Sequence, residues 1–140
     1  MEFLPSDIEG VCLIKPDIFR DQRGFFMETF NRSKYDKNLP YSFVQDNISS
    51  SRRGVVRGLH YQLKQPQGKL VFVLAGEIFD VAVDIRRGSP TFGQSVGYNL
   101  SDENRHQLFI PPGFAHGFMV LSETAYVYYK CTDLYLNGDE

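Results

Sequence analysis

His60 and Lys69 are the residues whose types and spacing first suggest chemistry in this chain. A histidine that titrates near neutral pH can accept a proton from carbon. A lysine ammonium can then hold the negative charge that the departing proton leaves on a neighbouring oxygen. The pair therefore suggests an enolate-forming site. The same spacing fits equally well a surface histidine and a lysine that only begins a strand.

The strand that carries His60 raises a geometric problem. Strict alternation along a strand places Arg57 and His60 on opposite faces. A β-bulge at Gly58 would bring both side chains inward, because a bulge inserts one extra residue into a strand. We therefore expect a bulge at this glycine if the two residues share a site.

His116 follows a stiff turn, PPGFA at residues 111–115, that would deliver it to the start of a strand. The alternative role is a histidine at the core edge bonded to a buried acid, for which Asp80 and Asp84 are the candidates. A metal site would need several histidines or carboxylates to converge. The chain has three histidines, and position 62, on the same strand face as His60, is a glutamine, so metal catalysis is disfavoured.

A tyrosine-rich strand near residue 129 offers a proton donor. Alternation separates Tyr126, Tyr128 and Lys130 from a set of smaller or apolar residues that includes Tyr129. Tyr129 is therefore the interior phenol, and it could protonate one face of a carbanion while His60 works on the other. Aromatic packing is the more common role for a tyrosine in such a strand.

Arginines supply candidate contacts for a diphosphate, since a guanidinium presents paired donors to phosphate oxygens. The candidates are Arg20, Arg23 and Arg57. Arg23 precedes Gly24-Phe25-Phe26, which could present a stacking surface for a base. No glycine-rich phosphate loop of the P-loop or Rossmann type is present, so nicotinamide chemistry has no support.

The composition limits the class of protein. A chain of 140 residues fits a single domain with one core. The net charge of -2 and the scattered basic residues argue against a nucleic-acid partner. The two distant cysteines and the absence of an apolar leader predict a cytoplasmic protein with free thiols. No apolar run approaches the roughly 20 residues that cross a bilayer, so a membrane role has no support.

Short segments bounded by glycine and proline predict an all-β fold, a barrel or a sandwich. The plainest strand is 77–85, in which an apolar face alternates with a face that carries two acids. Residues 69–74 precede it, and Ala75-Gly76 predicts a tight turn that pairs the two segments as a hairpin. One or two short helices are expected, at 31–38 after an asparagine cap and at 101–104 after a serine cap. The other expected strands are 10–15, 24–30, 42–48, 55–62, 95–100, 107–110, 117–121 and 125–132.

Several motifs in order resemble the dTDP-4-dehydrorhamnose 3,5-epimerase family. They run from about residue 10 to the end of the chain, and no single block decides the match. The motifs are RGFFME (23–28), QDN (45–47), RGLHYQ (57–62), QGKLV (67–71), DVAVDIR (80–86), SPTFG (89–93) and IPPGFAHGF (110–118).

The resemblance implies a cupin-type jelly roll that works as a homodimer without metal or organic cofactor. It implies epimerisation of dTDP-4-dehydro-6-deoxy-glucose at C3 and C5 on the way to dTDP-L-rhamnose. His60 matches the family's base, Tyr129 its acid and Lys69 the residue that steadies the enolate. The positions that match the family's substrate-lining residues are Arg23, Glu28, Gln45, Asn47, Arg57, His116 and Glu140. Arg23 and Glu28 belong to an N-terminal segment that the family passes to the neighbouring subunit's pocket.

The length departs from the family's pattern. Related chains continue for several dozen residues, which hold an aspartate that hydrogen-bonds the catalytic histidine and a lysine near the nucleotide. Residues 1–140 are therefore expected to form a single cupin-like domain without that segment. Either the chain is a fragment, or Asp80, Asp84 or another acid takes the orienting role, or the chain binds sugar nucleotide without full turnover. The alternatives are a 3-epimerase, a 3,4-ketoisomerase, a cupin that only binds a sugar nucleotide, and a metal-dependent cupin.

Overall fold

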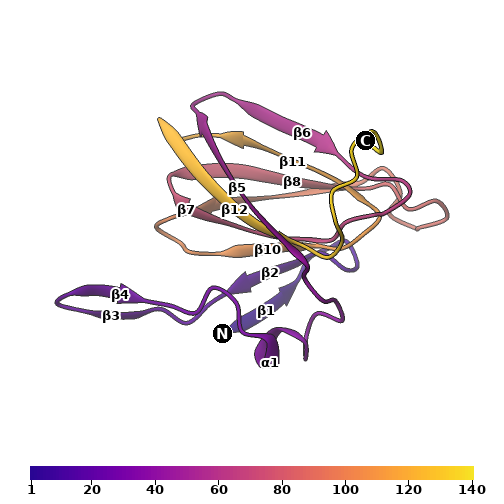
Figure 1. The fold of residues 1–140 in the computed structure, drawn as a ribbon. Coiled ribbons are helices and arrows are strands. Elements are labelled where there is room, and N and C mark those ends of the chain that lie inside the picture. The colour runs from indigo at the N-terminus through magenta and orange to yellow at the C-terminus, as the bar shows by residue number, and fades with distance from the viewer.

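Two antiparallel sheets and a separate two-stranded ribbon make up the fold (Figure 1). A computed structural model describes residues 1–140. The larger sheet has the order β1 (Glu2–Pro5), β2 (Cys12–Lys15), β10 (Gln107–Ile110), β7 (Lys69–Ala75), β12 (Thr124–Cys131), β5 (Gln45–Arg52). The smaller has the order β6 (Val56–His60), β11 (Phe114–Val120), β8 (Glu77–Asp84), β9 (Ser95–Ser101). The predicted all-β class is confirmed.

The ten predicted strands are all present with shifted ends, and the structure adds β1 and β3 (Phe19–Asp21). Helix α1 (Arg32–Tyr35) follows its predicted cap, since the Ser33 amide donates to Asn31 Oδ1 at 3.1 Å. The predicted second helix at 101–104 is wrong. Ser101 and Asn104 each accept the other's backbone N–H, at 3.1 and 3.0 Å, and so close an isolated turn. No helix has the length and apolar character needed to cross a bilayer.

The predicted hairpin between 69–74 and 77–85 is also wrong, because β7 and β8 lie in different sheets. The connecting Gly76 has a φ of +89°, and a Cβ there would stand 2.2 Å from the Thr124 carbonyl oxygen. Its amide donates to Asp102 at 2.8 Å, and the next amide donates to Ser122 at 2.8 Å. These contacts turn the chain from one sheet into the other.

The core lies between the two sheets, and β8 contributes an inward face that carries its acids. Ile78, Asp80, Ala82 and Asp84 are each 0% exposed, whereas Phe79 on the opposite face is 39% exposed. The buried apolar residues of the core are Ile8, Val11, Val71, Val73, Ile78, Ala82, Leu100, Leu108, Ile110, Phe114, Phe118, Val120, Ala125 and Val127. Two carboxylates thus enter an apolar interior, which is unfavourable unless each is paired.

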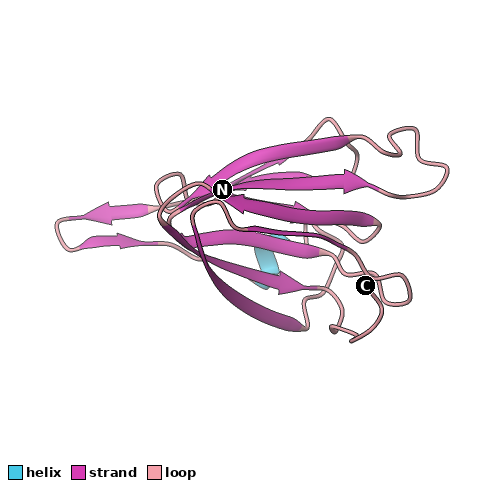
Figure 2. Ribbon diagram, turned by 90° about the horizontal axis from the view of Figure 1, so that it is seen from above, coloured by secondary structure: helices cyan, strands magenta, loops and turns pink.

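A ribbon formed by β3 and β4 (Gly24–Phe26) projects away from the sandwich, at the end opposite the C-terminus in both views (Figures 1 and 2). Its phenylalanines are exposed, with Phe19 at 63% and Phe26 at 66%. Apolar side chains of this size are rarely left on a monomer's surface in a group. The ribbon also lies far from the end of the sandwich where residue 140 is placed.

Candidate active site

A cavity of about 260 Å³ lies between the two sheets. Strands β5, β7 and β12 of the larger sheet and β6 and β11 of the smaller sheet supply most of its walls. Eight of the ten residues that match the family's catalytic or substrate-lining positions line it: Gln45, Asn47, Arg57, His60, Lys69, His116, Tyr129 and Glu140. A second cavity of about 140 Å³ adjoins it and shares five of its lining residues.

The expected bulge brings Arg57 and His60 to the same cavity. His60 pairs with His116 and Arg57 pairs with Phe118, so three steps along β6 match two along β11. Gly58, inside this irregularity, has a φ of +116°, and a Cβ on it would lie 2.6 Å from the His116 carbonyl oxygen. Only glycine fits there, because other residues would be strained and would clash with β11.

His116 is held by a buried acid, as one of its two predicted roles required. Its Nε2 lies 2.9 Å from both carboxylate oxygens of Asp80. The His116 ring also lines the cavity, so this residue both pairs with a buried acid and lies at the candidate site. Asp84 is occupied elsewhere, because it accepts hydrogen bonds from Arg86, Ser89 and Thr91, and these hold the pKa of its carboxyl well below the usual range.

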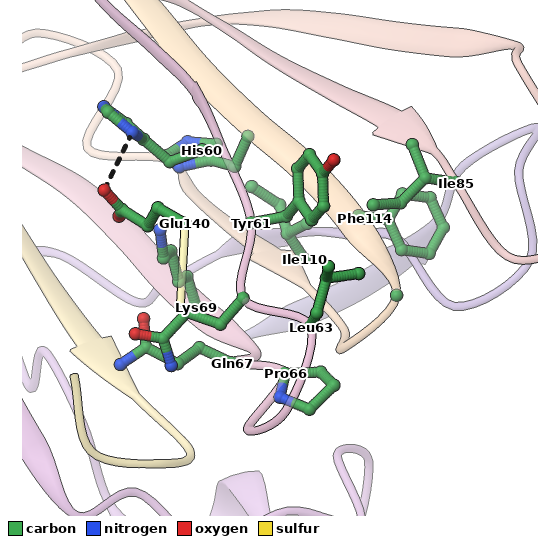
Figure 3. Close-up of a pocket in the computed structure, with 13 residues that line it drawn as sticks. His60, Tyr61, Leu63, Pro66, Gln67, Lys69, Ile85, Ile110, Phe114 and Glu140 are labelled. Carbon is green, nitrogen blue, oxygen red and sulfur yellow. Dashed lines mark ion pairs between the residues drawn. The ribbon is translucent and has the colours of Figure 1, made fainter. Parts of the chain in front are cut away.

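Neither Asp80 nor Asp84 forms an ion pair with His60, so among the acids considered for orienting this ring only the third possibility, another acid, has a contact with it. The acid beside it is Glu140, whose Oε2 lies 3.5 Å from His60 Nδ1 (Figure 3). The carboxylate can therefore form an ion pair when the imidazole is protonated. In Figure 3, Lys69 extends toward this same pair from β7.

Lys69 and Tyr129 lie near each other in the wall of the cavity, with the Lys69 Nζ 5.8 Å from the centre of the Tyr129 ring. The predicted alternation of β12 is confirmed, since Ala125, Val127 and Cys131 are buried on the Tyr129 side. Burial lowers the pKa of the Lys69 ammonium and raises the pKa of the Tyr129 phenol. The phenol therefore keeps its proton, whereas the ammonium releases its proton more readily than an exposed lysine.

The shift at Lys69 predicts an alkaline limit on activity. A folded-state pKa below the ordinary 10.5 means that the ammonium disappears, as pH rises, before an unperturbed lysine would lose its charge. Lys69→Arg should move this decline of kcat to higher pH, because a guanidinium stays protonated, while the rate falls through altered geometry. A pH–rate profile of both proteins measures the effect. A decline at the same pH in both would assign it to another group.

Four lining residues were missed by sequence reasoning: Ser49, Gln67, Phe118 and Tyr135. Ser49 follows the period of two that starts at Gln45, so alternation along β5 was the available signal. Its hydroxyl oxygen is buried without a hydrogen-bond partner. Asn47 is better fixed, because its amide accepts from Gln45 at 3.1 Å and donates to Cys131 at 3.5 Å.

Arg23 and Glu28 do not reach the cavity of their own chain. Arg23 lies on the projecting ribbon and pairs with Asp21 at 2.6 Å. Glu28 accepts from Lys34 at 2.6 Å and from Asn31 at 3.2 Å. A role for these two residues at a neighbouring subunit's pocket stays a prediction.

Comparison with known proteins decides the family. The family model for dTDP-4-dehydrorhamnose 3,5-epimerase matches residues 5–140. The chain belongs to this family. The epimerase of this name from Methanothermobacter thermautotrophicus is 56% identical over 134 residues, which make up 95% of this chain and 72% of that protein.

Solved structures of the dTDP-4-dehydrorhamnose 3,5-epimerase family share the fold. The enzyme from Legionella pneumophila, solved with dTDP-4-keto-L-rhamnose, has a TM-score of 0.96 at 56% identity and covers 99% of this chain and 74% of its own. ChmJ, a 3'-monoepimerase from Streptomyces bikiniensis solved with dTDP-quinovose, has a TM-score of 0.91 at 31% identity, over 97% of this chain and 70% of its own. The predicted cupin-like fold is confirmed by this agreement.

Proposed function

We propose that the chain epimerises dTDP-4-dehydro-6-deoxy-glucose at C3 and C5 and so forms dTDP-4-dehydro-L-rhamnose, a precursor of rhamnose. The observation that carries the proposal is the cavity that His60, Lys69, His116 and Tyr129 share, each from a different strand. Family membership supports the substrate class. The 4-keto group supplies the acidity, since protons on both flanking carbons are lost to a delocalised enolate.

The proposed step moves two protons and no other atoms. His60 Nε2 removes the proton from the ring carbon, and the C–H electrons move to form the enolate with its charge on O4. Tyr129 then donates its phenolic proton to the other face of the same carbon as the C–C double bond reverts to the ketone. The imidazolium and the phenolate return to their starting forms by exchange with solvent. The raised pKa of Tyr129 supports this role, because the phenol is protonated before the reaction begins.

The other lining residues supply charge and position. The Lys69 ammonium and the His116 ring, anchored by Asp80, face the cavity where O4 would become negative. Arg57 is held at its Nε by the Ser51 hydroxyl at 2.8 Å and forms no ion pair within 4.0 Å. It is therefore free to meet a phosphate or a sugar hydroxyl, beside Gln45 and Asn47. Glu140 would stabilise the imidazolium of His60.

Solvent exchange tests the reaction directly. In deuterated water, the sugar product should carry label at both C3 and C5. A second candidate, the 3-epimerase, is favoured by the likeness to ChmJ and would label C3 alone. A 3,4-ketoisomerase would move the ketone. Binding of dTDP without any exchange would instead identify a sugar-nucleotide-binding protein.

The proposal needs neither metal nor organic cofactor. The structure has no group of three or more His, Cys, Asp or Glu side chains that could hold a metal ion. Metal analysis of the purified protein tests this part. Stoichiometric iron, manganese or nickel would favour the metal-dependent alternative.

The proposal also includes a cytoplasmic location for the protein.

A homodimer that exchanges the ribbon of β3 and β4 would complete the site. The support is the projection of this ribbon, its exposed phenylalanines and the distance of Arg23 from its own cavity. In such a dimer, Arg23 would meet the nucleotide bound to the partner subunit, and Glu28 would line the same pocket.

Subunit mixing tests the exchange. Arg23→Ala and His60→Asn should each be poorly active alone, whereas a refolded equal mixture should recover roughly a quarter of wild-type activity, because half of the dimers are mixed and each has one intact site. Activity of the mixture is measured against each variant refolded by itself. A mixture no more active than the mean of the two variants would exclude the exchange.

A further inference from the structure

The ribbon of β3 and β4 belongs to neither sheet, because its two strands pair only with each other. Its direction relative to the sandwich therefore depends on side-chain contacts, since a two-stranded hairpin is only marginally stable by itself in water. That direction bears on the proposed function. Arg23 lies in the turn between the two strands, so the place that its guanidinium reaches in a partner subunit is set by the angle of the ribbon.

Arg105, which lies just before β10, connects the sandwich to the ribbon. The central carbon of its guanidinium lies 4.4 Å from the centre of the Phe25 ring in β4. Its Nη1 donates to the carbonyl oxygen of Leu74 in β7 at 3.2 Å. A cation over an aromatic face is attracted by the negative charge density of that face. One side chain thus holds β4 against the end of β7.

Gln107, two residues further along, holds a second point on the same segment. This residue is 0% exposed, and its Nε2 donates to the Thr29 carbonyl oxygen at 2.8 Å. The Tyr35 hydroxyl lies 3.2 Å from the same oxygen and can also donate to it. Phe25 and Thr29 are four residues apart, so contacts at both fix the direction in which the ribbon leaves the sandwich.

The backbone of Arg105 has a φ of +54°, in the left-handed region that favours glycine. Asn104 holds the chain in this turn, because its Oδ1 accepts from the Ser101 and His106 amides at 3.1 and 2.9 Å. The Nε of Arg105 is also buried without a hydrogen-bond partner. An arginine here therefore costs free energy in two ways, and the contacts of its guanidinium with Phe25 and Leu74 are the interactions that offset this cost.

We propose that Arg105 is a positioning residue, which holds the β3–β4 ribbon at the angle from which Arg23 reaches the nucleotide in the partner subunit's pocket. The inference rests on the ribbon exchange proposed above. Arg105 lines neither of the cavities beside His60. Its effect should therefore fall on binding of the nucleotide, through the ribbon, and not on proton transfer.

Arg105→Gly is the informative variant, because glycine adopts the left-handed conformation without strain while the contact with Phe25 is lost. The protein should remain folded and should bind dTDP roughly two- to thirtyfold more weakly in calorimetry, the range expected for loss of a cation–π contact. KM should rise by more than kcat falls. Arg105→Lys keeps a cation near the ring and should retain most of the affinity. The control is Arg53→Gly, which changes an exposed arginine outside this cluster and should bind dTDP like the wild type.

A double-mutant cycle with Arg23→Ala shows whether the effect passes through Arg23. In the Arg23→Ala background, Arg105→Gly should weaken binding little further, because the side chain that it positions is already gone. Equal losses in both backgrounds would overturn the inference, as would wild-type affinity in Arg105→Gly alone. Wild-type affinity in Arg23→Ala would instead refute the proposed exchange itself.

The Met27 methyl group reports on the ribbon without substrate or turnover. Met27 follows β4 and lines a surface pocket together with Phe25 and Arg105. In protein labelled with ¹³C-methyl methionine, its resonance should shift in Arg105→Gly and stay close to the wild-type position in Arg105→Lys. Met119, which is 40% exposed on β11, is the internal control and should not shift. An unmoved Met27 resonance in Arg105→Gly would overturn the inference, even if epimerisation were confirmed.

Discussion

His60→Asn is expected to lower epimerisation by about 10²- to 10⁴-fold, the usual contribution of a general base. Asparagine is polar and compact enough for the cavity, but its amide cannot take a proton from carbon. Deuterium entry from solvent into C3 and C5 should fall by the same factor, because both positions depend on the same imidazole. Binding of dTDP, measured by calorimetry, should change little, since His60 lies at the sugar end of the proposed site.

His106→Asn is the control for this prediction. His106 lies between β9 and β10, outside both cavities, and its ring forms no hydrogen bond. The same chemical change there should leave exchange at the wild-type rate. Exchange by His60→Asn within a few-fold of wild type would refute His60 as the base and direct attention to His116.

Tyr129→Phe should separate proton exchange from inversion. His60 can still remove a proton and return a deuteron to the same face, so label should enter the recovered substrate. Inversion should fall by about 10²- to 10⁴-fold, because phenylalanine has no proton to give to the opposite face. Mass spectrometry of the recovered sugar measures the label, and NMR coupling constants measure the configuration at C3 and C5.

The adjacent residue provides a matched control. Tyr128 faces away from the cavity, and its hydroxyl donates to Asp46 at 2.7 Å on the outer surface. Tyr128→Phe should therefore epimerise normally. Equal loss of exchange and inversion in Tyr129→Phe would contradict the assignment of separate faces to the phenol and the imidazole.

Ten of the twelve strands were predictable from an alternating or apolar pattern bounded by glycine or proline, whereas β1 and β3 were missed. The outward Tyr126 and Tyr128 and the inward Tyr129 followed from this alternation. Which strands pair with each other could not be predicted in the same way. The short Ala75-Gly76 connection is typical of a hairpin, yet the amide contacts to Asp102 and Ser122 lead β8 into the other sheet.

The site followed a similar division. The chemistry of His60, Lys69 and Tyr129 was read from residue type and motif, and the bulge at Gly58 from the conflict between Arg57 and His60. The choice between Asp80 and Asp84 as the partner of His116 could not be predicted from the sequence, because both acids share one face of β8. The register of β11 against β8 places His116 opposite Ala82, between the two acids, and Asp80 is the partner while Arg86, Ser89 and Thr91 occupy Asp84.

By itself, the sequence determined the class of fold, the alternation of faces along its strands and the family, since these depend on local pattern and on residue type. Only the tertiary structure decided that Glu140 lies beside His60, that Arg105 contacts Phe25 of the ribbon, and that Arg23 lies far from its own cavity. Those relations depend on which distant segments meet, and burial and hydrogen bonding select the partners only after the two sheets have packed.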